Sequence, residues 1–158
     1  MSVFFIMVSL ALYQPDQAGN VGTLLRMGAC LNMPVHIIHP CGFSFCEKAF
    51  RRSAMDYSDS AVIVEHDDYQ NFFDNNPQSR IILLTTKASS SYIDFKFQTH
   101  DILLLGQESA GVPEYVHNHA SARIKIPMAK EMRSMNIAIA GAFIMGEALR
   151  QTQGFAKL

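Results

Sequence analysis

Residues 134–146 constrain the fold of this chain more than any other segment, because these thirteen positions carry no charged side chain. Ser134 is expected to be the N-cap of a helix, since its hydroxyl can accept a hydrogen bond from an exposed backbone N–H. The apolar residues that follow occupy every side of a helical wheel, and such a helix must be covered all round. A chain of 158 residues has difficulty covering it alone, so we expect a second subunit to contribute.

Strands and helices alternate along the chain. Residues 81–85 and 102–105 are continuous apolar runs, which are typical of strands buried on both faces. We therefore predict an α/β fold with a mostly parallel sheet and helices on both faces, in a single domain over residues 1–158. The predicted strands are residues 8–13, 35–38, 61–64, 81–85, 102–105 and 123–126. The predicted helices run from about 20 to 33, from 47 to 55, from 67 or 68 to about 75, and from 134 to about 152.

The N-terminal apolar run, residues 3–8, needs a separate interpretation. A signal peptide would have basic residues before this run and a small-residue cleavage site after it, and neither is present. The run is also too short to span a bilayer. We expect a buried strand with a short leader and no membrane association.

Charge and cysteine content exclude some classes of protein. The formal net charge is −1, so RNA binding would have to depend on a local basic patch. Cys30, Cys41 and Cys46 are odd in number and lack a paired C-x-x-C spacing, which favours reduced thiols in a cytoplasmic protein without a disulfide framework or a zinc site.

Three strand ends are candidate ligand sites, because ligands of parallel α/β sheets bind at the carboxyl ends of the strands. These are residues 84–87, 106–111 and 126–128. The glycines at 106 and 111 do not form a dinucleotide fingerprint or a phosphate-binding loop. Taken alone they are typical of an ordinary turn, and their position after a buried strand is what suggests a function.

Several polar groups have both a structural and a functional interpretation. Residues 66–68 (His-Asp-Asp) suggest a metal ligand set or a capped helix start, and we favour the cap because no further ligand has a suitable spacing. Ser109 lacks the G-x-S-x-G pattern of a hydrolase nucleophile. Lys48, Arg51 and Arg52 share one short helix, either as a solvated face or as a contact for RNA phosphates.

The segment 19–26 follows the first strand directly. Asn20 can cap the helix that starts there, and Gly22 would let a ligand approach the backbone. Arg26 is either a surface arginine or a functional cation.

Taken together, these residues resemble the SPOUT superfamily of RNA methyltransferases. Residues 20–26 match N-x-G-x-x-x-R, residues 104–113 match L-x-G-x-E-x-x-G-x-P, and residues 126–136 match I-P-M-x-x-x-x-R-S-M-N. The phrases at 50–57 and 65–69 are similar to the single-domain TrmL branch, which methylates the ribose 2′-hydroxyl at the tRNA wobble position. The resemblance covers nearly the whole chain.

This resemblance implies a C-terminal trefoil knot, a homodimer and S-adenosylmethionine as the cofactor. It assigns Leu84, Gly106, Ile126 and Ser134 to cofactor binding, and it assigns Arg26 as the catalytic residue. An arginine stays protonated at ordinary pH, so we favour an electrostatic clamp over a literal base.

The expected substrate is the anticodon loop of tRNA, with C or a modified U at position 34 and with leucine isoacceptors favoured. Ser134 and Asn136 are expected to orient the nucleotide. The RNA-contact candidates are Asn20, Asn136, Lys48, Arg51 and Arg52. No metal is expected. Thr23 stands where the family commonly has Asn, and the serine-rich loop at 89–91 also departs from the branch.

Three alternatives remain open at this stage. The chain could methylate another RNA, such as ribosomal RNA, or bind RNA or S-adenosylmethionine without catalysis. Outside the family, a flavodoxin-like nucleotide binder is weakened by the absence of a phosphate loop in the sequence.

Overall fold

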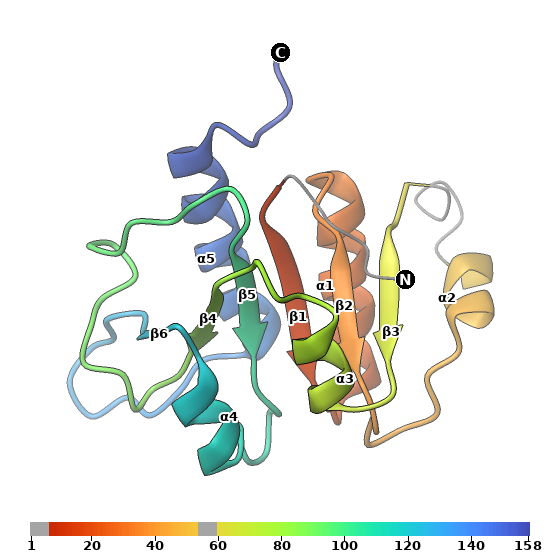
Figure 1. The fold of residues 1–158 in the computed structure, drawn as a ribbon, viewed down its shortest axis with the longest axis horizontal. Coiled ribbons are helices and arrows are strands. Elements are labelled where there is room, and N and C mark those ends of the chain that lie inside the picture. Colours follow the sequence, from red (N-terminus) through yellow and green to blue (C-terminus); the bar gives the residue numbers. More distant parts are fainter. Residues whose placement is uncertain (1–6, 54–59) are drawn as a thin grey trace.

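Six parallel strands form one sheet in the computed structural model, which describes residues 7–53 and 60–158 (Figure 1). The order across the sheet is β3-β2-β1-β5-β4-β6. The predicted parallel α/β fold is therefore confirmed. The strands are β1 (Ser9–Tyr13), β2 (Val35–Ile38), β3 (Ile63–His66), β4 (Ile81–Leu84), β5 (Ile102–Leu105) and β6 (Ala122–Ile124).

Helices cover both faces of this sheet, with α1 (Ala18–Cys30) and α5 (Ile137–Thr152) behind it in Figure 1 and α3 (Tyr69–Asp74) and α4 (Glu114–His119) in front. Side chains alternate between the faces with the period of two that a strand imposes. In β1, Leu10 and Leu12 belong to the apolar core under α1 and α5, whereas Ala11 and Tyr13 belong to the core under α3 and α4. The remaining helix, α2 (Glu47–Ser53), lies beyond the β3 edge (Figure 1).

The long helix α5 packs closely on α1 and β5 through a glycine. A Cβ added to Gly141 would lie 2.9 Å from Leu24 Cδ2 and 3.1 Å from Leu105 Cδ1, so a larger residue would push the helix outward. The opposite face is only partly covered by the described residues of this chain, since the ring of Tyr92 contacts that of Phe143 edge-on at a centroid distance of 6.4 Å. Ile139 and Phe143 remain 54% and 46% exposed on it.

The predicted caps of α1 and α5 were both wrong. Asn136 is the N-cap of α5, because its Oδ1 accepts hydrogen bonds from the backbone N–H of Ala138 at 2.9 Å and of Ile139 at 3.2 Å. Ser134 stays in the preceding loop. Helix α1 begins at Ala18, so Asn20 lies inside its first turn and directs its amide elsewhere.

Strand β3 lies two residues later than predicted, because a buried histidine extends it. His66 is 3% exposed and pairs in register with Ile38 of β2. Its ring stacks on His36 at a centroid distance of 5.1 Å, and the two rings share a hydrogen bond of 2.9 Å. A search for apolar runs counts histidine as polar and therefore ends the strand too early.

Helix α4 was not among the predicted helices. Its signals are present but weak over six residues: Pro113 precedes it, Glu114 lies in its first turn, and His117 and His119 lie in its last turn. This arrangement complements the helix dipole.

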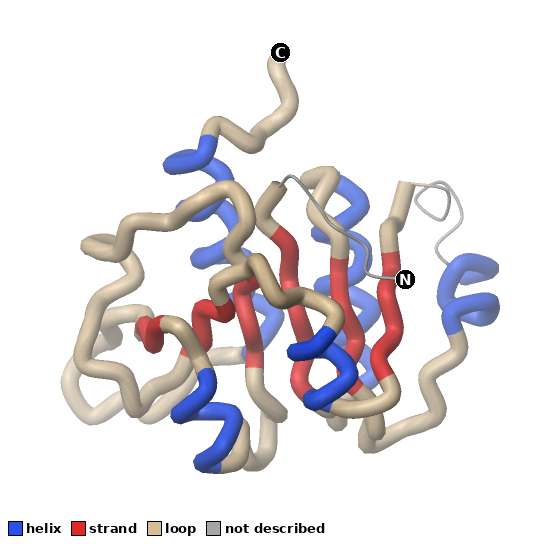
Figure 2. Tube along the Cα trace, in the orientation of Figure 1, coloured by secondary structure: helices blue, strands red, loops and turns tan. Residues whose placement is uncertain are grey.

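A long loop, residues 85–101, connects β4 to β5 (Figure 2). It is hydrogen-bonded to later parts of the chain. Tyr92 N donates to Lys125 O at 2.9 Å, just after β6. Near the other end of the loop, Gln151 of α5 accepts from Phe97 N and donates to Phe95 O, both at 2.9 Å. The loop therefore holds both the end of β6 and the last turns of α5.

Some predictions lie outside the described residues: the leader at 3–6, the end of the second predicted helix at 54–55, and residues 54–57 of the branch-like phrase. In the described part of the chain, none of the helices combines the length and apolar content that a bilayer span requires.

Candidate active site

A cavity of about 790 Å³ opens at the carboxyl ends of β4, β5 and β6. The register of the sheet explains its position. Leu84 pairs with Leu105 on one side and with Ile124 on the other, so these three strands end in the same row. The segments that follow them, together with the loop before α5, form the walls.

All four residues assigned to the cofactor line this cavity. Leu84 and Gly106 lie at the ends of β4 and β5, and Ile126 follows β6. Ser134 contributes from the loop before α5. The three strand ends singled out in the sequence thus meet at one place. Other lining residues include Thr85, Glu108, Val112, Pro127, Met128 and Ile137.

The turn between Gly106 and Gly111 has a geometry that only glycine permits. Gln107 and Gly111 exchange backbone hydrogen bonds of 2.9 and 3.0 Å, which closes the turn. A Cβ on Gly106 would lie 2.8 Å from the backbone carbon of Gly111, and Gly111 itself has a φ of +64°. These glycines are therefore both turn residues and part of the cavity wall.

A chain of hydrogen bonds connects the three sequence motifs beside the cavity. Asn136 Nδ2 donates to Asn20 Oδ1 at 3.1 Å, and Asn20 Nδ2 donates to Glu108 Oε1 at 3.3 Å. Glu108 Oε2 in turn accepts the backbone N–H of Asp16 at 3.1 Å. Asn20, Glu108 and Asn136 all line the cavity. No role was predicted for Glu108, although it lies inside the second motif.

Two carboxyl groups in this chain shift each other's acidity. Burial raises the pKa of Glu108, and its hydrogen bond with the Asp16 side chain raises it further. Conversely, the pKa of Asp16 is lowered by its hydrogen bond with Glu108 and by the hydroxyl of Ser109. Glu108 is thus the first of the pair to take up a proton as the pH falls. Ser109 donates its hydroxyl to Asp16.

Arg26 lies outside the set of residues that line the cavity. It is exposed on α1, six residues after Asn20. At about 1.5 Å per residue, this places it roughly 9 Å further along the helix axis. The fold therefore brings Asn20 and Asn136 to the site but leaves Arg26 on the outer surface of the same chain.

The basic residues of α2 lie at the other edge of the sheet, beyond β3. Arg51 has a structural role, since it pairs with Glu47 at 2.8 Å and donates to Ala61 O at 2.9 Å. Lys48 and Arg52 are exposed. None of the three lines the cavity described above.

The alternative chemistries find little support in the structure. Asp68 caps α3 by accepting from Asn71 N at 2.7 Å, which confirms the capping interpretation of residues 66–68. Within residues 7–53 and 60–158, no three His, Cys, Asp or Glu side chains group closely enough to hold a metal ion. Cys30, Cys41 and Cys46 are free thiols, and burial raises the pKa of Cys41 to about 11.

Comparison with known proteins gives consistent matches over this whole arrangement. The SpoU rRNA Methylase family matches residues 7–146. The tRNA (cytidine(34)-2′-O)-methyltransferase of Ancylobacter novellus is 50% identical over 152 residues, covering 95% of this chain and 96% of the relative. The enzyme of the same name from Escherichia coli strain K12 is 33% identical over 147 residues, covering 92% and 94%.

A solved structure is also similar over nearly its full length. It is described as giving structural insights into the 2-OH methylation of C/U34 on tRNA. It superposes with a TM-score of 0.85 at 34% identity, over 94% of this chain and 97% of the other.

Proposed function

This chain belongs to the SpoU rRNA Methylase family, and from that premise we propose that it transfers a methyl group from S-adenosylmethionine to the ribose 2′-hydroxyl of the wobble nucleotide of tRNA. One observation carries the proposal: all three sequence motifs contribute residues to a single cavity at the strand ends. The relatives named for methylation at position 34 support the same reaction and the same nucleotide.

The cavity suits S-adenosylmethionine in size and chemistry. Its volume of about 790 Å³ lies within the roughly 300–1,000 Å³ of small-molecule sites. Leu84, Val112 and Ile126 supply apolar surface for an adenine ring, and the closed glycine turn brings main chain close to the ligand. Ser134 and Glu108 supply polar groups for hydroxyl and amino functions. We propose that Leu84, Gly106, Ile126 and Ser134 hold the cofactor.

The bound cofactor supplies an electrophilic methyl group on a positively charged sulfur. The 2′-oxygen of the ribose would accept this methyl group, and its hydroxyl proton would pass to water. Because the leaving group is already good, alignment of the ribose should provide much of the rate. We assign this alignment to Asn136 and Asn20, which are joined to each other beside the cavity.

Arg26 is proposed to stabilise the developing negative charge, acting as a fixed cation. Because it lies outside its own chain's cavity, it would act at the cavity of a second copy. The outer face of α5, with Ile139 and Phe143, is apolar and exposed, and α1 with Arg26 packs beside α5. We therefore propose a homodimer that pairs these faces and completes each site with the partner's α1.

The proposed topology includes the trefoil knot of the family. In its support, residues 85–101 are bonded both to the end of β6 and to α5. The proposed substrates are leucine isoacceptors, recognised through the anticodon loop, and the proposed location is the cytoplasm. Lys48 and Arg52 are candidates for RNA contacts from the partner's side of the site.

A methyl-transfer assay tests the proposal directly. The purified protein is incubated with labelled S-adenosylmethionine and tRNA from cells that lack this gene, and the modified nucleotide is mapped. We expect a 2′-O-methyl group at position 34. Label in ribosomal RNA would redirect the activity to another RNA, and binding of S-adenosylmethionine without any transfer would indicate a binding module.

A further inference from the structure

We infer that four cationic side chains around the cavity mouth, Lys87, Lys125, Lys130 and Arg133, bind the phosphate backbone of the RNA substrate. We call these four residues the basic rim. The inference rests on the proposed function, because it concerns how the same site holds its RNA.

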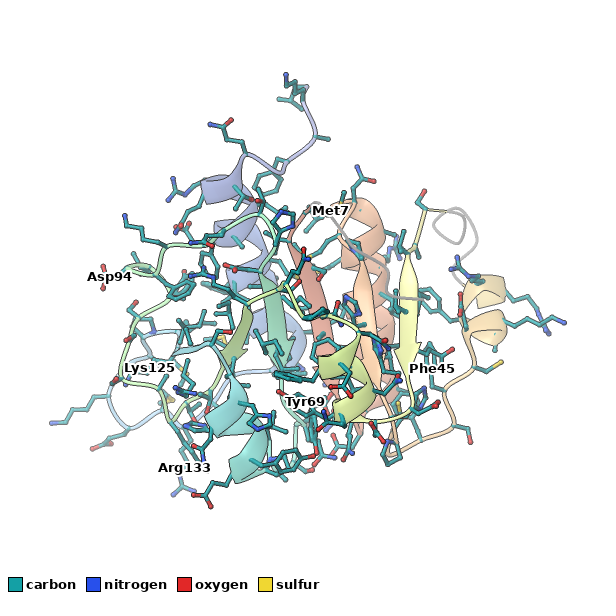
Figure 3. The ribbon with its side chains drawn as sticks, in the orientation of Figure 1. Met7, Phe45, Tyr69, Asp94, Lys125 and Arg133 are labelled. Carbon is teal, nitrogen blue, oxygen red and sulfur yellow. The ribbon has the colours of Figure 1, made fainter. Side chains whose placement is uncertain are left out.

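The basic rim borders the cavity on two sides. Lys125 and Arg133 line the cavity themselves. Lys87 directly follows a lining residue at the end of β4, and Lys130 lies between two lining residues in the loop before α5. Figure 3 labels Lys125 and Arg133 on one side of the molecule, whereas Phe45, close to α2 in the chain, lies on the other.

The backbone that carries the two outermost lysines is held by local hydrogen bonds. Lys87 N donates to Thr85 Oγ1 and Ala88 N to Thr85 O, both at 3.2 Å. Met132 N donates to Ala129 O at 3.1 Å, which closes the turn around Lys130. Lys87 and Lys130 are both exposed on these hydrogen-bonded turns.

The charges of the basic rim are available to an external anion. In the part of the chain that the structure describes, none of its four side chains is within ion-pair distance of a carboxylate. Arg51 of α2, by contrast, is paired with Glu47. Across the whole chain, 13 cationic side chains face 14 acidic ones, so a polyanion has no general attraction and must find a local patch.

The position of the basic rim also matches what catalysis needs. Contacts to phosphates fix the register of a nucleic acid without reading its bases. A ribose is flanked by two phosphates, so cations around the mouth can hold the strand while its 2′-hydroxyl enters. In one chain, Lys48 and Arg52 are too far across the sheet to do this, since α2 follows the opposite edge.

The test measures the salt dependence of tRNA binding, using a purified leucine tRNA and filter binding between 50 and 200 mM KCl. Lys87→Gln and Lys130→Gln are compared with Lys157→Gln, a matched change in the C-terminal tail at the far end of the molecule (Figure 1). The slope of log K against log salt should fall in magnitude by about 0.7–0.9 for each lost phosphate contact. The affinity for S-adenosylmethionine should stay unchanged in all three variants.

The outcomes separate this inference from the proposed function. Unchanged slopes in Lys87→Gln and Lys130→Gln, with methyl transfer to tRNA intact, would contradict phosphate binding by the basic rim. The proposed reaction would still stand. Reduced slopes without methyl transfer by the wild-type chain would support the basic rim and overturn the proposed reaction. The double variant Lys48→Gln, Arg52→Gln adds a further comparison. If only this variant reduces the magnitude of the slope, the phosphates bind at α2 and the inference is wrong.

Discussion

The side-chain amide of Asn136 donates to Oδ1 of Asn20 across 3.1 Å, although the two residues are 116 positions apart in the chain. Asn136 also caps α5, and Asn20 also bonds to Glu108. Two hydrogen bonds through Asn20 therefore join the start of α1, the start of α5 and the turn after β5. The cavity lies between these three segments, so its shape depends on these bonds.

Replacing Asn136 with Ala should weaken both the helix and the site. Loss of an N-cap costs about 1 kcal/mol of unfolding free energy, and the freed Asn20 should also loosen the cavity. Urea unfolding and calorimetric titration of S-adenosylmethionine measure the two effects. Asn136→Ser keeps a capping oxygen, so it should recover stability but not cofactor affinity. Equal recovery of both would show that the bond to Asn20 has no role in the site.

Gly106→Ala should distort the cavity, because the new Cβ would lie 2.8 Å from the backbone of Gly111. Overpacking of this kind costs roughly 1–3 kcal/mol, and we expect cofactor affinity to fall at least tenfold. Gly146→Ala in α5 is the matched control, since its Cβ would meet no atom within 4 Å. That variant should bind the cofactor normally. Normal cofactor affinity in Gly106→Ala would contradict the proposal that this turn forms part of the cofactor site.

Arg26→Ala should lower turnover by about 10²–10³-fold if the guanidinium stabilises developing charge. Affinity for S-adenosylmethionine should be retained, because Arg26 does not line the cavity of its own chain. Single-turnover methyl transfer is the measurement. Lys157→Ala, which removes an exposed cation from the C-terminal tail, serves as the control. Wild-type turnover by Arg26→Ala would exclude the assigned role.

Ile139→Glu should convert the proposed dimer to a monomer by placing a charge on the exposed face of α5. Light scattering at micromolar concentration reports the mass, and activity should fall with it. Phe155→Glu changes a residue of similar exposure, 48% against 54%, on the C-terminal tail and should leave both unchanged. A wild-type chain that is monomeric in the same measurement would refute the dimer itself.

The buried histidine pair predicts a loss of stability in acid. Burial, followed by the neighbouring His66, lowers the pKa of His36 from 6.5 to about 3. Burial also lowers the pKa of His66. Below pH 6.5 these two histidines therefore bind protons in the unfolded chain but not in the folded chain. Stability should be complete above this pH and should fall by about 1.4 kcal/mol per pH unit for one such site as the pH drops toward 3.

Urea unfolding at several values between pH 7.5 and 4.5 measures this dependence. His36→Gln removes one titrating group and should flatten the curve. His119→Gln, at an exposed position, should keep the wild-type slope. Identical slopes for the wild type and His36→Gln would show that the pair does not control acid stability.

The parallel sheet could be predicted from the sequence because β4 and β5 are unbroken apolar runs, which leave few alternatives to strands buried on both faces. The cavity followed from the rule that ligands bind at strand ends, and Leu84, Gly106 and Ile126 were found in this way together with the family resemblance. Local patterns placed α2 and α3 within a few residues of their positions, since Asp68 is a strong capping residue.

Features that depend on long-range contacts could not be predicted. Asn136 rather than Ser134 caps α5, because the amide of Asn136 also finds Asn20 across the fold. The coupling of Glu108 with Asp16 joins residues 92 positions apart and leaves no local pattern. Likewise, nothing in the segment around Arg26 indicated which side of α1 would face the cavity.

The shared row in which β4, β5 and β6 end also limits how this family of sequences can change in length. Adding or removing one residue within residues 81–84 or 102–105 would turn every following side chain to the other face of the sheet. It would also offset one wall of the cavity from its neighbours, because Leu84 would no longer align with Leu105 and Ile124. Insertions and deletions should therefore be absent from these strands among active relatives, while substitutions between apolar residues remain frequent.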